Sequence, residues 1–153
     1  MNRPTARGWC PGALRPMMSG DGLLVRIRPT LGRLKADQVY ALCEAADAFG
    51  SGLMDLTNRA NIQIRGVTQE NFERLLTCLD AAGLVDHDLE CEVRNNIIVS
   101  PLWQNGDDTC CIATELKARL QELPDLPAKF SAGLGVPAET SVGRSPTYPR
   151  SFP

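Results

Sequence analysis

Apolar residues in the first half of the chain recur with a period of two in some segments and of about four in others, which predicts strands and helices in turn. The run 23–28 alternates apolar and polar residues and stops at Pro29, as expected for a half-buried strand. Segment 35–49 has helical spacing and is closed by Gly50. The next expected elements are strands at 52–56 and 60–67 and a helix that opens at Thr68 and is closed by Gly83. The order β-α-β-β-α predicts an α+β domain.

The pattern weakens beyond Gly83. A short strand is expected at 96–99, and a third helix from residue 109 or 110 to residue 123. Residues 1–20 are rich in Pro, Gly and Met and are interpreted as an arm. From about residue 131 the chain consists mainly of Gly, Pro, Ser and Thr without apolar periodicity, which predicts a disordered tail.

Polar residues occupy alternate positions through the strand expected at 60–67 and the residues just before it. At about 3.3 Å per residue, such a row of guanidinium and amide donors extends for about 20 Å and suits an extended acidic ligand. Thr57 precedes the row at a position that favours a turn. An exposed strand face is commonly polar for solvation alone, so the spacing leaves both interpretations open. The residues of the row are Arg59, Asn61, Gln63 and Arg65.

Arg26 and Arg28 alternate in the same way on the first expected strand. If this strand is a neighbour of strand 60–67, like charges would oppose each other at a cost of roughly 0.2–1 kcal/mol per pair. A bound anion would remove this cost. Arginine suits a carboxylate ligand because its planar fork can donate two parallel hydrogen bonds.

The same region carries a family resemblance. The pattern Leu56-Thr57-x-Arg59-x-Asn61-Ile62-Gln63-Ile64-x-Gly66 resembles the strand-turn-strand motif in the ferredoxin-like half-domain of nitrite and sulfite reductases. Within that superfamily, segments 7–12, 15–17 and 20–26 resemble the opening of the precorrin-3B synthase family, and Asp55 fits that branch. Segments 94–95, 100–102 and 126–130 resemble the start of the family's next module.

The resemblance implies a ferredoxin-like half-domain followed by a partial second module. The expected domains are an arm at 1–20, the half-domain at 21–85, an incomplete cluster or sirohaem-type module at 86–130, and the tail at 131–153.

The resemblance also implies an oxidoreductase of cobalamin biosynthesis that hydroxylates precorrin-3A and forms a lactone, with a [4Fe-4S] cluster and a sirohaem-like tetrapyrrole. In the family the Arg and Gln of the motif touch acidic side chains of sirohaem. The candidate tetrapyrrole- or anion-binding residues are therefore Arg26, Thr57, Arg59, Asn61, Gln63 and Arg65.

The six cysteines, at positions 10, 43, 78, 91, 110 and 111, form no Cys-x2-Cys pair. Reduced thiols rather than disulfides are expected if the chain is cytoplasmic, and without such spacing no zinc site is predicted. The two spaced cysteine pairs that hold the family's cluster are absent. We therefore expect no metal or cofactor to be held by this chain alone, and no activity from it alone.

Composition narrows the functional classes further. The net charge of −2 and the pI near 5.4 give no indication of a nucleic-acid-binding protein. The sequence has no run of 18 apolar residues and no apolar signal-peptide core, which predicts a cytoplasmic protein without a membrane segment. His87 lies between two acidic residues and is interpreted as a solvated loop residue.

Three functions remain open. The chain is an N-terminal fragment of a precorrin-3B synthase-like enzyme or of a sirohaem-dependent nitrite or sulfite reductase, a non-catalytic tetrapyrrole-binding module, or a half-domain that pairs with a partner. The partner would be a second copy or a complementary reductase-type chain, because a lone half leaves a sheet edge uncovered. The abrupt change near Ser131 suggests a truncated or frame-shifted gene product.

Overall fold

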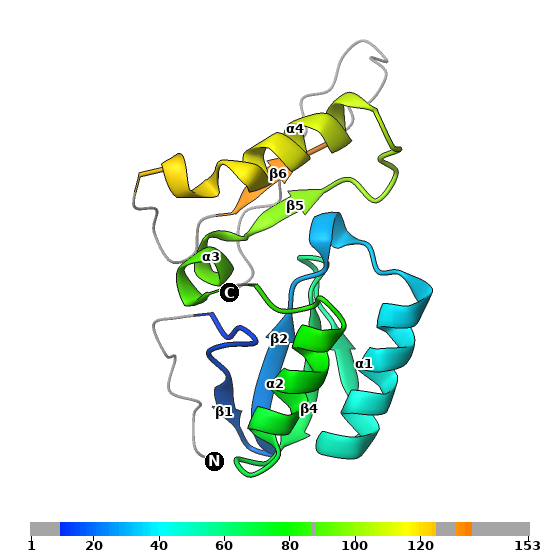
Figure 1. Ribbon diagram of the computed structural model, residues 1–153, viewed down its shortest axis with the longest axis vertical. Coiled ribbons are helices and arrows are strands. Elements are labelled where there is room, and N and C mark those ends of the chain that lie inside the picture. The colour runs from blue at the N-terminus through cyan, green and yellow to red at the C-terminus, as the bar shows by residue number, and fades with distance from the viewer. Residues whose placement is uncertain (1–9, 87, 125–130, 136–153) are drawn as a thin grey trace, which may run out of the picture.

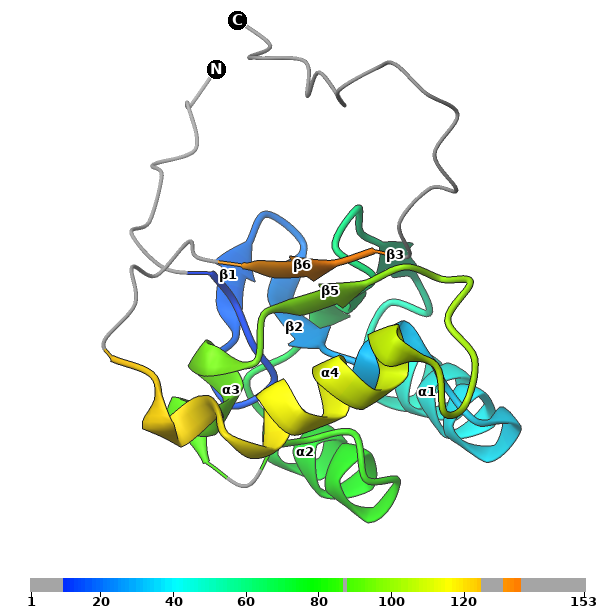
Figure 2. The ribbon, with the colours of Figure 1, turned by 90° about the horizontal axis from the view of Figure 1, so that it is seen from above.

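The computed structural model describes residues 10–86, 88–124 and 131–135. Its larger part is an antiparallel sheet with two helices on one face (Figures 1 and 2). In the sheet the strands follow the order β1-β2-β4-β3. The elements are β1 Met17–Ser19, β2 Gly22–Ile27, a 3-10 turn Thr30–Gly32, α1 Ala36–Phe49, β3 Met54–Leu56, β4 Ile62–Val67 and α2 Phe72–Ala81. The predicted α+β class and the β-α-β-β-α order of a ferredoxin-like half-domain are confirmed.

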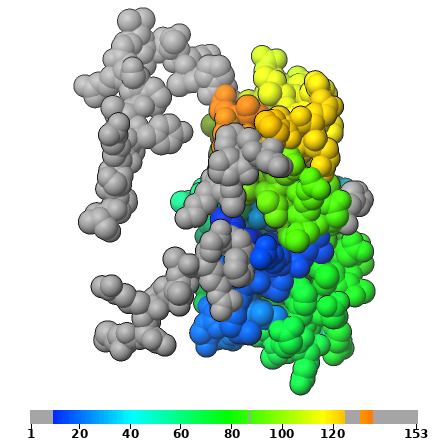
Figure 3. All heavy atoms as spheres, turned by 90° about the vertical axis from the view of Figure 1, so that its left-hand side faces the viewer, coloured from blue at the N-terminus to red at the C-terminus, as the bar shows by residue number. Residues whose placement is uncertain are grey.

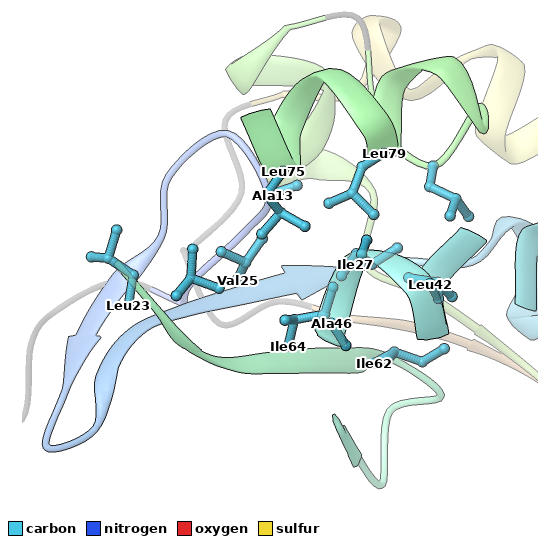
Figure 4. Packing of buried hydrophobic residues seen from close by; sticks show 13 residues of the cluster. Ala13, Leu23, Val25, Ile27, Leu42, Ala46, Ile62, Ile64, Leu75 and Leu79 are labelled. Atoms are coloured by element: carbon cyan, nitrogen blue, oxygen red, sulfur yellow. The ribbon is translucent and has the colours of Figure 1, made fainter. Parts of the chain in front are cut away.

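The core lies between this sheet and the two helices (Figure 4). The inward residues of β2 and β4 meet Leu42 and Ala46 of α1 and Leu75 and Leu79 of α2. Burying each large aliphatic side chain contributes roughly 1.5–3 kcal/mol, so this stripe holds the helices on the sheet. The inward strand residues are Leu23, Val25, Ile27, Ile62, Ile64 and Val67.

An irregularity in β4 explains why its apolar spacing is not a strict alternation. The pairing with β2 shifts between Leu23↔Val67 and Val25↔Ile64. One additional residue is thus accommodated in β4, next to Gly66, whose φ of 68° lies in the left-handed region that glycine tolerates. The shift returns Val67 to the core face while Arg65 stays on the opposite face.

A smaller unit follows α2. It contains α3 Leu89–Arg94, β5 Ile97–Val99, α4 Asp108–Ala118, a 3-10 turn Leu120–Glu122 and β6 Ala132–Leu134, with β5 and β6 parallel. Trp103 packs with Val99 and Ala113 in a second small core. The Trp103 indole N–H donates to the carbonyl of Leu31 at 3.0 Å, and the guanidinium of Arg33 stacks 3.6 Å from the ring centroid. This one side chain therefore connects the small unit to the segment after β2.

Three elements correct the sequence analysis. Strand β1 and the buried Ala13 lie in the segment interpreted as an arm, and β6 lies in the segment interpreted as a disordered tail. Helix α3 was not predicted. Each is only three to six residues long, which is too short for an apolar period to be recognised in the sequence. His87, Trp9 and the motif at 126–130 lie outside the described residues.

Candidate functional site

The candidate residues gather on the sheet face that points away from α1 and α2. The strand register places Arg26 of β2, Gln63 of β4 and Asp55 of β3 side by side in one row. Arg26 thus opposes an amide, and the expected opposition of like charges between these two strands does not occur. The face is polar because its residues alternate with the core residues of the same strands.

The exposed strand row predicted from the sequence is wrong in two respects. Arg59 lies in the turn before β4, and Asn61 precedes the strand, so only Gln63 and Arg65 belong to it. Asn61 and Gln63 are also buried. Gln63 is flanked on both sides by the neighbouring strands β2 and β3.

Thr57 builds the turn that carries Arg59. Its hydroxyl oxygen accepts from the amide of Asn61 at 3.1 Å and from the amide of Arg59 at 3.4 Å. Its own amide donates to the carbonyl of Asn61 at 2.9 Å, and Ala60 adopts a left-handed φ of 54°. These bonds satisfy backbone groups that a free loop would leave to water, and they fix the point from which the Arg59 side chain leaves the chain.

One end of the face is neutralised by acids. The Arg65 guanidinium donates to Asp21 at 2.9 and 3.1 Å, to Asp55 at 3.1 Å and to the hydroxyl of Ser19 at 3.2 Å. The hydrogen bonds to Asp21 and Asp55 raise the pKa of Arg65, and the bond to Arg65 lowers the pKa of Asp21. The Arg65 fork is thus occupied by the protein's own carboxylates.

The other end carries an excess of positive charge. Burial is the main cause that lowers the pKa of Arg26. The nearby charges of Arg28 and Arg59 lower this pKa further, whereas Cys10 raises it. With the Gln63 amide oriented so that its oxygen faces Arg26, that oxygen accepts from Arg26 Nη2 at 2.6 Å and from Nε at 3.0 Å. Gln63 therefore orients one of three neighbouring guanidiniums.

Arg28 belongs to this group although it was not among the candidate binding residues. Its side chain is only 7% exposed, and within the described part of the chain its Nε and Nη1 atoms donate no hydrogen bond. Its Nη2 donates weakly to the carbonyl of Pro11 at 3.4 Å. A cavity of about 10 Å³ is lined by Arg28 together with Arg59 and Asn61. The alternation of Arg28 with Arg26 on one strand was the sequence signal for it. We name Arg26, Arg28 and Arg59 the arginine cluster.

Metal-binding clusters and membrane-spanning helices are both absent from the described ranges. No three His, Cys, Asp or Glu side chains gather there in a way that could hold a metal ion. No described helix has the length and apolar character needed to cross a bilayer.

A family model decides the assignment of the half-domain. Residues 15–82, which include β1 to α2, match the nitrite/sulfite reductase ferredoxin-like half domain. The half-domain of this chain belongs to that family. Its two-helix, antiparallel-sheet architecture agrees with the match.

Full-length relatives support the same family. The chain is 38% identical over 131 residues to a precorrin-3B synthase of Sinorhizobium. The aligned region covers 85% of this chain and 28% of the relative. It is 26% identical to a ferredoxin–nitrite reductase of Leptolyngbya laminosa, over 88% of this chain and 28% of the relative. A sulfite reductase hemoprotein beta-component of Chromohalobacter salexigens is 30% identical over 91% of this chain and 25% of its own length. The chain thus spans about a quarter of these relatives, and no solved structure matches it significantly.

Proposed function

We propose that the arginine cluster binds the carboxylate side chains of an acidic tetrapyrrole, and that the chain acts as the N-terminal part of a cytoplasmic, precorrin-3B synthase-like oxidoreductase of cobalamin biosynthesis. The proposal rests on the uneven distribution of charge over the sheet face that points away from α1 and α2. Acids neutralise Arg65 at one end, while at the other end Arg26 lies near Arg28 and Arg59, and among the described residues these three form one ion pair with an acid, that of Arg28 with Glu92. An anionic ligand is the chemistry that this imbalance fits.

The six candidate residues take different parts in this proposal. Arg26 and Arg59 contact ligand carboxylates, and Gln63 and Thr57 hold them in place through the bonds described above. Asn61 lies beside Arg28 and Arg59 at the small cavity. Arg65 has the weakest direct role, because its donors already have acidic partners.

The described residues fit a tetrapyrrole better than they fit an iron–sulfur cluster. Arg28 offers two guanidinium donors that have no hydrogen-bond partner in the described part of the chain, as a carboxylate ligand requires. The cysteines, by contrast, are all unpaired by disulfides and do not gather in groups within the described ranges. A [4Fe-4S] cluster is therefore assigned to no residue of this chain.

A specific observation favours a second candidate, the partner half-domain. Strand β3 forms one edge of the sheet, and its apolar side chains face outward, with Leu56 84% exposed and Leu53 and Met54 also exposed. An apolar edge strand pairs readily with another strand. A second copy or a complementary reductase-type chain would cover it.

The proposal is tested with ligands of opposite charge. Uroporphyrin, which carries eight carboxylates, should bind the chain, whereas a tetracationic porphyrin with N-methylpyridyl groups should not. Raising the salt concentration should weaken uroporphyrin binding, because screening acts on the charge interaction. Soret absorbance titrations give both affinities. Equal affinity for the two porphyrins would show that binding is not carried by the arginine cluster.

A further inference from the structure

We infer that Glu92 is a positioning residue that sets the anion affinity of the arginine cluster by acting as the internal counter-ion of Arg28. The inference rests on the proposed function in so far as the ligand is an oxyanion, either a tetrapyrrole carboxylate or a free ion such as sulfate. It adds a residue from α3, outside the matched half-domain, to the control of the site.

The Glu92 carboxylate of α3 lies between Arg28 and the N-terminal turn. Its Oε1 lies 3.4 Å from Arg28 Nη1, and the two side chains are 4% and 7% exposed. The amides of Ala13 and Leu14 donate to the same carboxylate, Leu14 at 3.2 and 3.3 Å. A Cβ at Gly12 would lie 2.1 Å from Glu92 Oε2, so the N-terminal turn closes directly over the carboxylate. Figure 3 shows the blue N-terminal residues against the green atoms of α3.

Arg28 forms an ion pair with Glu92, but this pair leaves guanidinium donors of Arg28 without a hydrogen bond among the described residues. Its Nε and Nη1 donate no hydrogen bond among the described residues, so the contact is electrostatic rather than a bidentate fork. A cavity of about 120 Å³ lies beside the pair, lined by Cys10, Arg15, Arg28, Glu92 and Asn96. This volume is well above the roughly 10–15 Å³ that one water molecule needs, which leaves room for an oxyanion at Arg28.

The charges around Glu92 determine the sign of its effect. Burial raises the pKa of Glu92, and Asp86 acts in the same direction, while the bonds from the turn and the charge of Arg28 oppose it. Arg15 and Cys10 face the shared cavity, and on α3 itself Glu90 pairs with Arg94 at 3.3 Å. Ionised Glu92 cancels the charge that Arg28 offers to a ligand. Protonated Glu92 leaves Arg28 as an uncompensated cation, so anion affinity rises as the pH falls through the pKa of Glu92.

The test uses a double-mutant cycle on the full chain with uroporphyrin at pH 7.5. Glu92→Gln keeps the shape and an acceptor oxygen, and it should bind uroporphyrin about tenfold more tightly than wild type because Arg28 loses its counter-ion. Arg28→Gln should bind more weakly, and adding Glu92→Gln to it should change nothing further. The control is Glu90→Gln, which removes an equal charge from an exposed site on the same helix. An unchanged or weaker Glu92→Gln, or an equal effect without Arg28, would overturn the inference.

A second experiment compares sulfate with chloride at equal ionic strength. Sulfate is chosen because its charge is constant above pH 5. The thermal midpoint of wild type should rise more with sulfate at pH 5 than at pH 8, and that of Glu92→Gln should respond alike at both values. A purely structural Glu92 would not produce this difference. If the sulfate results hold and no variant binds uroporphyrin, the proposed tetrapyrrole function fails while the counter-ion role stands. If wild type binds uroporphyrin with no pH-dependent sulfate response, the counter-ion role fails and the proposed function stands.

Discussion

Trp103→Ala should lower the free energy of unfolding by about 3–5 kcal/mol, the usual cost of removing a buried tryptophan. The ring is 7% exposed, and its loss would remove the centre of the small core formed with Val99 and Ala113. The hydrogen bond to the Leu31 carbonyl and the stacking of Arg33 would be lost at the same time. The reason for the large effect is that one side chain joins the small unit to the segment after β2.

Urea denaturation followed by circular dichroism measures this change. The adjacent Leu102→Ala is the matched control, because Leu102 is 78% exposed and should change stability by no more than about 0.5 kcal/mol. Hydrogen exchange should also become faster in β5 and β6 in the Trp103 variant. If both variants unfold at the same urea concentration, the contact between the two units does not contribute to stability.

Gly50→Ala should destabilise the half-domain by about 3 kcal/mol, at the upper end of the usual cost of overpacking. A Cβ there would lie 2.6 Å from the backbone carbonyl oxygen of Arg65 and 3.1 Å from Ile64 Cγ2. The obstacle is backbone, which cannot rotate away as a side-chain end can. The end of α1 would therefore have to move away from β4.

Gly20→Ala is the control for this substitution. Apart from its two chain neighbours, no described residue has an atom within 4 Å of the position that its Cβ would take, so its thermal midpoint should stay close to that of wild type. The measurement is thermal unfolding of both variants under identical conditions. A Gly50 variant as stable as the Gly20 variant would contradict the close packing of α1 on β4.

The half-domain could be predicted from sequence because its elements are encoded locally. The alternating segment of β2 and the helical stripes of α1 and α2 each contain enough residues for a period to be recognised. Strands β1 and β6 have three residues each, and their pairing partners decide their conformation. Helix α3 is similarly short, and it begins where the side chain of Asp88 accepts from the amide of Cys91. Elements of three to six residues are too short for a period to be recognised in a single sequence.

Sequence patterns selected the candidate residues but did not indicate how they are arranged. The motif identified Arg59 and Gln63, and strand alternation pointed to Arg26. The pairing of Arg65 with Asp21 could not be foreseen, because the two residues are 44 positions apart and meet only when β1 and β2 join the sheet. The same holds for Glu92, which reaches Arg28 from a helix that follows the half-domain.

We expect the arginine cluster, and not the whole polar face, to bind an acidic tetrapyrrole. The most direct test is a Soret titration of wild type, Arg59→Ala, Arg65→Ala and Arg119→Ala with uroporphyrin. Each variant loses one positive charge, and Arg119 pairs with Glu115 and Glu122 on a distant helix end. Charged hydrogen bonds contribute roughly 1.5–3 kcal/mol, so Arg59→Ala should bind about 10- to 100-fold more weakly. The Arg65 and Arg119 variants should stay within about threefold of wild type, as expected for groups outside the contact. Equal affinity of wild type and Arg59→Ala would contradict the account.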